Sequence, residues 1–256
     1  VSFFPNDGKD PSELIRQADL AMYQAKEGGR NQVILFDEKM DHNSYDRIIK
    51  ENALRRALDR GEFRLYYQPQ VDILNKKVIG VEALIRWKHP EFGLVPPNEF
   101  ISLCEELKLI IPMGKWIIKE ASRQLLVWRN AGIMVEKMSI NLSGVQIVQA
   151  DFIEEVLSIF KENSCDPTLI EFEITETSLI KNLNQSSAVL EELKSHGFKF
   201  AIDDFGTGYS SLAYLKKLPF DTIKIDREFI IDLPSDQHDI SIVQTVLSLA
   251  KDIGYK

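Results

Sequence analysis

From Gly61 onward, short apolar segments alternate with segments of helical periodicity, and this alternation limits the possible folds more than any other feature. The predicted strands are residues 64–68, 78–84, 137–142, 169–175, 199–203 and 222–225. The predicted helices are residues 97–107, 113–130, 151–162, 185–196, 210–217 and 239–254. Strands that alternate with helices are typical of an α/β protein, in which helices cover a mainly parallel sheet.

The first two predicted strands are an exception to the parallel arrangement. Only residues 69–77 separate them, which is too short for a helical crossover, so we expect this pair to run antiparallel. Six strands precede Lys256, whereas a closed barrel of this kind needs eight. We therefore expect either a barrel that is incomplete at its C-terminal end or an open sheet with a covered edge.

Residues 1–40 contain too few predicted elements to form a core of their own. Residues 10–29 have the pattern of a helix and residues 32–36 that of a strand, and one helix with one strand buries little surface. The polar segment 41–60 carries Leu54 and Leu58 at helical spacing, which suits a linker helix. We expect the end of another domain at 1–40, a linker at 41–60 and the main domain at 61–256.

Composition excludes several functional classes. The chain has 44% hydrophobic and 27% charged residues, as globular proteins do, and no apolar run long enough to span a membrane. Its two cysteines, Cys104 and Cys165, lack metal or redox spacing, which favours reduced thiols and a cytoplasmic location. A net charge of −8 argues against a polynucleotide partner, but divalent metal ions would let an acidic site hold a small phosphate ligand.

Oxygen-bearing side chains stand at the C-terminal ends of consecutive predicted strands. They are Glu82, Asn141, Glu173, Asp203 and Asp204. In barrels of this kind the active site lies at that end of the sheet. An all-oxygen set favours Mg²⁺ or Mn²⁺, and two such ions are suited to phosphodiester cleavage. Consecutive aspartates are often only solvated loop charges, but here a strand precedes them and glycines follow.

Two cationic side chains accompany these oxygens. Glu82, Leu84 and Arg86 share one face of their strand, which would place an arginine beside a bound phosphate. Lys224 lies within the last predicted strand, where it would orient a water or stabilise negative charge on phosphorus. Each of the two is equally consistent with a structural ion pair.

Several short motifs together resemble the EAL family. They are YQP at 67–69, EALIRW at 82–87, NLS at 141–143, EITE at 173–176, DDFGTGYSSL at 203–212 and KID at 224–226. Their order along the chain is the one that this family uses. Residues 18–26 and 29–31 resemble the last helix and strand of a GGDEF domain, but the signature loop of that family is not in the sequence, so no cyclase activity is assigned.

The resemblance implies a modified (β/α)8 barrel with an antiparallel first strand, here truncated after about six strands. It implies hydrolysis of the bacterial second messenger cyclic di-GMP to linear pGpG. Glu82, Asn141, Glu173 and Asp203 would bind one Mg²⁺ or Mn²⁺, and Asp203 with Asp204 would reach a second.

The resemblance also implies roles for residues around the metals. Lys224 would hold the nucleophilic water, and Glu176 would anchor the loop 204–211, through which the domain forms a homodimer. The expected substrate contacts are Gln68, Leu84, Arg86 and Asp221, with Pro219 and Phe220 shaping the pocket. With Glu82, the expected catalytic residues are Lys224 and Glu176.

Two alternatives stay open at this point. The family continues with a seventh strand carrying a metal-binding glutamate and an eighth carrying a glutamine, and neither is in this sequence. The chain would then be a receptor that binds cyclic di-GMP without cutting it, or a regulatory partner of GGDEF and sensory domains upstream. Those upstream domains would also carry any membrane anchor of the parent protein.

Overall fold

The computed structural model describes residues 1–27, 32–180, 183–206 and 218–256. These residues form two compact units, Val1–Gly61 and Glu62–Lys256. Within the described ranges, no helix has both the length and the apolar character needed to cross a bilayer.

The first unit contains the helices α1 (Pro11–Glu27) and α2 (Glu38–Ala57). Asp10 stabilises the start of α1 because its carboxylate accepts a hydrogen bond from the Glu13 N–H at 2.9 Å. The predicted strand at 32–36 is wrong. Its recorded backbone hydrogen bonds run between Val1 and residues Ile34 and Phe36, and a single terminal residue cannot form a strand ladder.

The second unit is built on one mixed sheet. Its strands are β1 (Phe63–Asp72), β2 (Lys77–His89), β3 (Gly93–Val95), β4 (Met138–Asn141), β5 (Ile170–Thr175), β6 (Lys199–Phe205) and β7 (Thr222–Ile225). The strand order is β1-β2-β4-β5-β6-β7, with the short β3 paired to β2. The β1–β2 pair is antiparallel, and the pairs β2–β4, β4–β5, β5–β6 and β6–β7 are parallel, as predicted. The barrel is not closed in this chain, since β1 and β7 lie at the two ends of the order.

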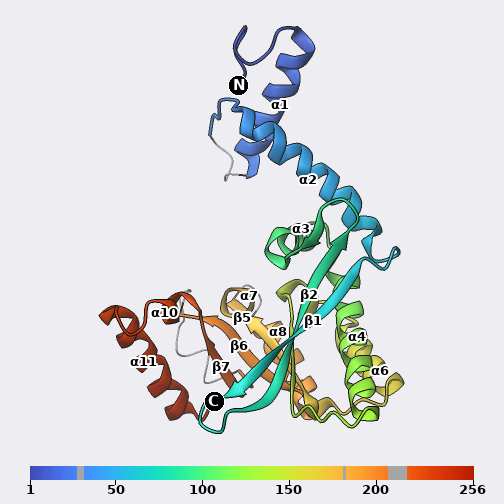
Figure 1. Cartoon of the computed structure of the whole chain (residues 1–256), viewed down its shortest axis with the longest axis vertical. Coiled ribbons are helices and arrows are strands. Elements are labelled where there is room, and N and C mark those ends of the chain that lie inside the picture. The colour runs from blue at the N-terminus through green and yellow to red at the C-terminus, as the bar shows by residue number, and fades with distance from the viewer. Residues whose placement is uncertain (28–31, 181–182, 207–217) are drawn as a thin grey trace. The chain divides into compact units, whose positions relative to one another are not determined.

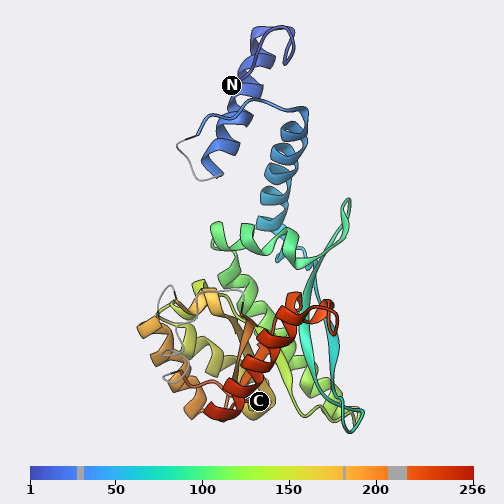
Figure 2. The ribbon, with the colours of Figure 1, turned by 90° about the vertical axis from the view of Figure 1, so that its left-hand side faces the viewer.

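Helices and 3₁₀ turns connect the strands and follow the last one. The helices are α3 (Ile101–Glu106), α4 (Ile110–Asn130), α5 (Gly144–Ile147), α6 (Phe152–Glu162), α7 (Glu176–Ile180), α8 (Leu183–Ser195), α10 (Glu228–Ile231) and α11 (Gln237–Ile253), with 3₁₀ turns η1 (Pro97–Glu99) and η2 (Pro167–Leu169). Helices α4 and α6 lie side by side, and α8 packs on α6 and on β6 (Figure 1). Figure 2 shows the tip of the β1–β2 hairpin, coloured teal, projecting from the edge of the unit.

Most of the long elements predicted for this unit are confirmed, whereas its shortest elements were not predicted. The predicted helix at 97–107 divides into η1 and α3, and the predicted helix at 210–217 lies outside the described residues. Helices α5, α7 and α10 and strand β3 have three to five residues each, too few to show a period in the sequence.

The apolar core lies between the sheet and the outer helices. In β5, Ile170, Phe172 and Ile174 are fully buried, and the Phe172 ring packs at 5.3 Å from that of Phe198. Because side chains alternate between the two faces of a strand, the intervening Glu171 and Glu173 point to the inner face. The same alternation in the neighbouring strands gives the sheet a polar inner face, which carries the candidate site.

Candidate active site

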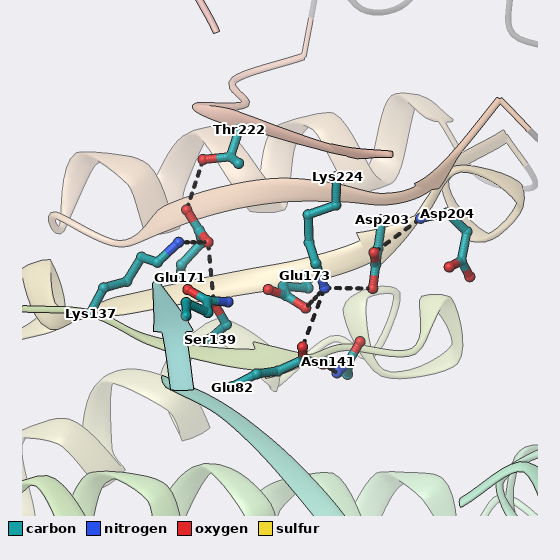
Figure 3. A network of polar contacts seen from close by, with 11 residues as sticks. Glu82, Lys137, Ser139, Asn141, Glu171, Glu173, Asp203, Asp204, Thr222 and Lys224 are labelled. Carbon is teal, nitrogen blue, oxygen red and sulfur yellow. Dashed lines mark hydrogen bonds and ion pairs between the residues drawn. The ribbon is translucent and has the colours of Figure 1, made fainter. Parts of the chain in front are cut away.

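Five predicted side chains converge where the parallel strands end. They are Glu82 from β2, Asn141 from β4, Glu173 from β5, Asp203 from β6 and Lys224 from β7 (Figure 3). We call them the carboxylate–lysine cluster. The Lys224 Nζ lies 3.0 Å from Asp203 Oδ2 and 3.5 Å from Glu82 Oε2, and it also donates a hydrogen bond to Glu173 Oε2. Asn141 Nδ2 donates to Glu82 Oε1 at 2.8 Å.

Burial and charge act against each other in this cluster. The Glu173 side chain is 0% exposed, and burial, opposed by Lys224 and reinforced by Glu82 and Asp203, raises its pKa to about 7. Burial would lower the pKa of Lys224, but the carboxylates of Glu173, Asp203 and Glu82 outweigh burial and raise it. One ammonium faces three carboxylates, so the ionised cluster has excess negative charge. Such a site attracts a further cation.

The donor set fits a hard cation. Glu82, Asn141, Glu173 and Asp203 offer only oxygen ligands, and Glu173 Oε1 is buried without a hydrogen-bond partner among the described residues. A buried carboxylate oxygen without a partner is costly, and a metal ion would satisfy it. As the side chains stand, no three His, Cys, Asp or Glu residues in the described ranges are arranged to hold a metal. A bound ion would compete with the Lys224 ammonium for Glu173 and Asp203.

The chain turns sharply after Asp203. Asp204 has a left-handed backbone with φ 53°, and the β6–β7 register shifts between Ile202 and Phe205. The Asp204 carboxyl is directed away from that of Asp203 (Figure 3). Partial burial raises the pKa of Asp204, and the nearby carboxylates of Asp203 and Asp226 raise it further, the latter also through a side-chain hydrogen bond.

Asp226 is a neighbour of Asp204 to which the sequence analysis assigned no role. It follows β7 and stands two positions after Lys224, the spacing that places two side chains on one face of an extended segment. That spacing was the available signal, but Asp226 lies beyond the strand and stands out in the sequence only as part of a motif.

Glu176 lies at the start of α7 and faces the beginning of the loop that follows β6. Its carboxylate is buried, and its Oε2 accepts a hydrogen bond from the Gly206 N–H at 3.4 Å. Gly206 has φ +105°, and a Cβ there would lie 2.9 Å from the Phe229 ring, so this position requires glycine. Residues 207–211 of the loop that Glu176 was predicted to anchor lie outside the described residues.

Three predicted substrate contacts lie in the β1–β2 hairpin beside Glu82. Gln68 pairs directly with Glu82, and Tyr66 pairs with Leu84. The Arg86 guanidinium lies 5.9 Å from the centre of the Tyr66 ring, and its Nη1 donates to the Ile85 carbonyl at 2.8 Å. Gln68, Leu84 and Arg86 therefore follow Glu82 along one face of the hairpin.

The fourth predicted substrate contact, Asp221, is not brought to the cluster. Its Oδ1 lies 3.0 Å from Lys194 Nζ, and its Oδ2 accepts from the Phe200 N–H at 3.0 Å. Lys194 also donates to the Pro219 carbonyl at 2.8 Å, so these contacts fix the segment before β7. Because Asp221 precedes Lys224 by three positions, the strand pleat directs the two side chains to opposite faces. Phe220 beside it is buried.

Comparisons with known proteins place the chain in a family. The model of the EAL domain matches residues 51–256. The chain is 39% identical over 256 residues to the "Bifunctional diguanylate cyclase/cyclic di-GMP phosphodiesterase MucR" of Pseudomonas aeruginosa, covering 100% of this chain and 37% of that protein. It is 36% identical over 254 residues to the "Cyclic di-GMP phosphodiesterase PdeR" of Escherichia coli, covering 99% of this chain and 38% of that protein.

A solved structure of a related protein has a similar fold. The "PaMucR Phosphodiesterase, c-di-GMP complex" superposes with a TM-score of 0.78 at 39% identity, covering 81% of this chain and 84% of that chain. The chain spans well under half the length of the two curated relatives. The matched range covers both the carboxylate–lysine cluster and the sheet that carries it, and the chain belongs to the EAL domain family.

Proposed function

We propose that this chain hydrolyses cyclic di-GMP to linear pGpG with the help of Mg²⁺ or Mn²⁺. The observation that carries the proposal is the convergence of Glu82, Asn141, Glu173, Asp203 and Lys224 at the C-terminal ends of the parallel strands. The names of the MucR and PdeR relatives, which share more than a third of their aligned residues with this chain, support the same substrate.

The acidic side chains of the cluster would hold the metal. Glu82, Asn141, Glu173 and Asp203 would bind one ion, and Asp203 with Asp204 would bind a second. Bound divalent ions supply a more acidic water and neutralise negative charge on a phosphodiester. The buried Glu173 oxygen that lacks a partner among the described residues supports the first of these sites.

The remaining side chains would bind and orient the reactants. The Lys224 ammonium already donates to Glu173 and Asp203, and with these partners taken up by a cation it would donate to the attacking water or to a phosphoryl oxygen. Gln68, Leu84 and Arg86 would hold the dinucleotide along the hairpin, with the Arg86 guanidinium on a phosphate. Glu176 would fix the loop that starts at Gly206.

The test measures pGpG formation and cyclic di-GMP binding on one preparation of the whole chain. We expect hydrolysis with Mg²⁺ or Mn²⁺, none in EDTA, and none with Glu82→Gln. Glu120→Gln, which alters an exposed ion pair with Arg123, is the matched control and should retain full turnover. Tight binding without turnover in either metal would instead support a receptor, and unchanged turnover in Glu82→Gln would remove the metal site.

The wider assembly is also part of the proposal. We infer that the domain works in the cytoplasm beside GGDEF and sensory domains and pairs with a second copy through the loop 204–211. The greater length of the curated relatives, and the cyclase activity in the name of MucR, support companion domains.

A further inference from the structure

A second polar layer lies beneath the carboxylate–lysine cluster, toward the N-terminal ends of the strands. Its centre is Glu171, whose side chain is buried with 3% exposed. Glu171 Oε1 accepts hydrogen bonds from Lys137 Nζ at 2.5 Å and from Ser139 Oγ at 3.2 Å. Glu171 Oε2 accepts from Thr222 Oγ1 at 2.9 Å (Figure 3). One carboxylate therefore joins strand β5 to β4 and to β7.

The three strands that Glu171 joins each also contribute a residue to the cluster. Ser139 precedes Asn141 in β4, Glu171 precedes Glu173 in β5, and Thr222 precedes Lys224 in β7, in every case by two positions. Residues two apart on a strand share a face and lie about 7 Å apart. Three of the five strands that carry the cluster are therefore joined one pleat before the site.

The bond between Glu171 and Thr222 crosses a strand. Strand β6 lies between β5 and β7, and there it presents Ala201, which pairs with Glu173 on one side and Thr222 on the other. Ala201 is fully buried, and its side chain is only a methyl group. A branched side chain in its place would occupy the space through which Glu171 reaches Thr222.

On the opposite side of the layer, a small residue likewise allows a hydrogen bond to pass across a strand. Gln70 of β1 donates to Ser139 Oγ at 3.2 Å past strand β2, whose residue at that level is Gly80. A Cβ on Gly80 would lie 3.1 Å from Gln70 Oε1 and 2.8 Å from the Lys137 carbonyl. Two small residues therefore let the lower layer extend across intervening strands.

The backbone pairing between β6 and β7 is irregular at Lys224. In the β6–β7 pairing, Ala201 pairs with Thr222 and Phe205 pairs with Ile225, and the register shift between Ile202 and Phe205 leaves no ladder partner for Lys224. Besides its own carboxylate partners, contacts that hold β7 just before Lys224 therefore help to set the position of the ammonium. The Thr222 hydroxyl, held by Glu171, is such a contact.

We propose that Glu171 and Thr222 are positioning residues for the carboxylate–lysine cluster. They fix β5 and β7 relative to each other so that Glu173 and Lys224 meet. This inference rests on the proposed function of the cluster. A purely structural role would lower stability and leave metal affinity and turnover unchanged, so these three quantities separate the two readings.

The test compares Thr222→Ala with Thr222→Ser, which keeps the hydroxyl. The control is Ser122→Ala, which removes a hydroxyl from the buried Ser122 in α4, whose Oγ accepts a hydrogen bond from Asn163 Nδ2 at 2.6 Å. We expect Thr222→Ala to lower kcat and weaken Mn²⁺ binding, measured by calorimetry, by about 10-fold, with little change in KM for cyclic di-GMP. Thr222→Ser should restore both. If Thr222→Ala lowers the melting temperature but leaves kcat and Mn²⁺ affinity unchanged, as Ser122→Ala should, the inference is overturned.

A second variant and a second readout keep the inference testable. Ala201→Val retains the Thr222 hydroxyl but blocks its approach to Glu171, and should reproduce the Thr222→Ala effects. If the wild-type chain neither binds Mn²⁺ nor cleaves cyclic di-GMP, the proposed function fails. The positioning role is then tested by the rate of backbone hydrogen exchange. Thr222→Ala should then speed exchange in 199–205 and 222–225 relative to Ser122→Ala, and equal exchange would overturn the inference.

Discussion

Lys224 and Glu173 form the innermost ion pair of the site, between an ammonium on β7 and a carboxylate on β5 whose side chain is 0% exposed. The pair uses one oxygen of Glu173, while the other oxygen is buried and has no hydrogen-bond partner among the described residues. Among the described residues, the inner end of the site therefore holds one satisfied and one unsatisfied carboxylate oxygen, and a metal ion would satisfy the second.

Replacing Lys224 by alanine removes the ammonium that compensates three carboxylates. We expect turnover to fall by about 100-fold or more, because a group that stabilises the transition state is lost. We also expect Mn²⁺ to raise the melting temperature more in Lys224→Ala than in wild type, since the Lys224 ammonium then no longer competes with the ion for these carboxylates. The measurements are steady-state kinetics and thermal unfolding with and without Mn²⁺.

Lys115→Ala is the control for this variant, because Lys115 pairs with Glu155 on an exposed surface. It should leave turnover and the Mn²⁺ effect unchanged. An equal Mn²⁺ shift in Lys224→Ala and wild type would show that the ion does not bind among these carboxylates.

Gly206→Ala tests how tightly the loop start is packed against α10. The added methyl group meets the Phe229 ring at 2.9 Å, in a backbone conformation that alanine disfavours. Gly132→Ala is a matched control, because Gly132 also has a positive φ of 76°, but a methyl group added there would meet no described atom within 4 Å. We expect Gly206→Ala to lose about 1–3 kcal/mol more unfolding free energy than Gly132→Ala, measured in urea. Equal losses would mean that Phe229 moves aside without cost.

Asp221→Ala separates a structural role from substrate contact. The variant leaves Lys194 and the Phe200 N–H without their carboxylate partner, so we expect a loss of about 1–3 kcal/mol in unfolding free energy. The affinity for cyclic di-GMP should fall much less than in Gln68→Ala, as measured by calorimetry. If Asp221→Ala bound cyclic di-GMP weakly and kept the wild-type unfolding free energy, Asp221 would be a substrate contact after all.

The two thiols give a prediction about pH. Burial raises the pKa of Cys104 to about 12 and that of Cys165 to about 11, each with a smaller contribution from a neighbouring carboxylate. Both pKa values are raised, so the stabilisation that comes from keeping the thiols protonated is complete below the unfolded pKa of 9.0 and is lost as pH rises above it. Thiol labelling of the native chain at pH 8 should be slow, with Cys165 reacting before the more deeply buried Cys104. Labelling as fast as in urea would contradict this assignment.

The long elements of the fold could be predicted because their patterns are local. Strand β7 begins and ends where the sequence placed it, and α4, α6, α8 and α11 match their predicted ranges within a few residues. Strand β2 continues five residues beyond its predicted end, to His89, because its later part pairs with β1 and β3, which the local sequence does not reveal. The helix α5 had a visible capping signal in Ser143 and Gln146, but four residues show no period.

The cluster could be predicted because its oxygen-bearing residues stand near the C-terminal ends of the apolar segments predicted as strands. Parallel strands bring such ends together, so positions along the sequence were enough to group Glu82, Asn141, Glu173 and Asp203. The lower layer could not be found in this way. Glu171 and Thr222 interact across a strand, through space that Ala201 leaves open, and this contact depends on register and on the size of a third residue.

The most direct test of the account is a crystal of the whole chain grown with Mn²⁺, with the ion located by its anomalous scattering. The account predicts a strong peak within coordination distance of Glu82, Asn141, Glu173 and Asp203, with Lys224 displaced from at least one of its carboxylate partners. A map with no peak there, and with the Lys224 ammonium still bonded to Glu173 and Asp203, would contradict it.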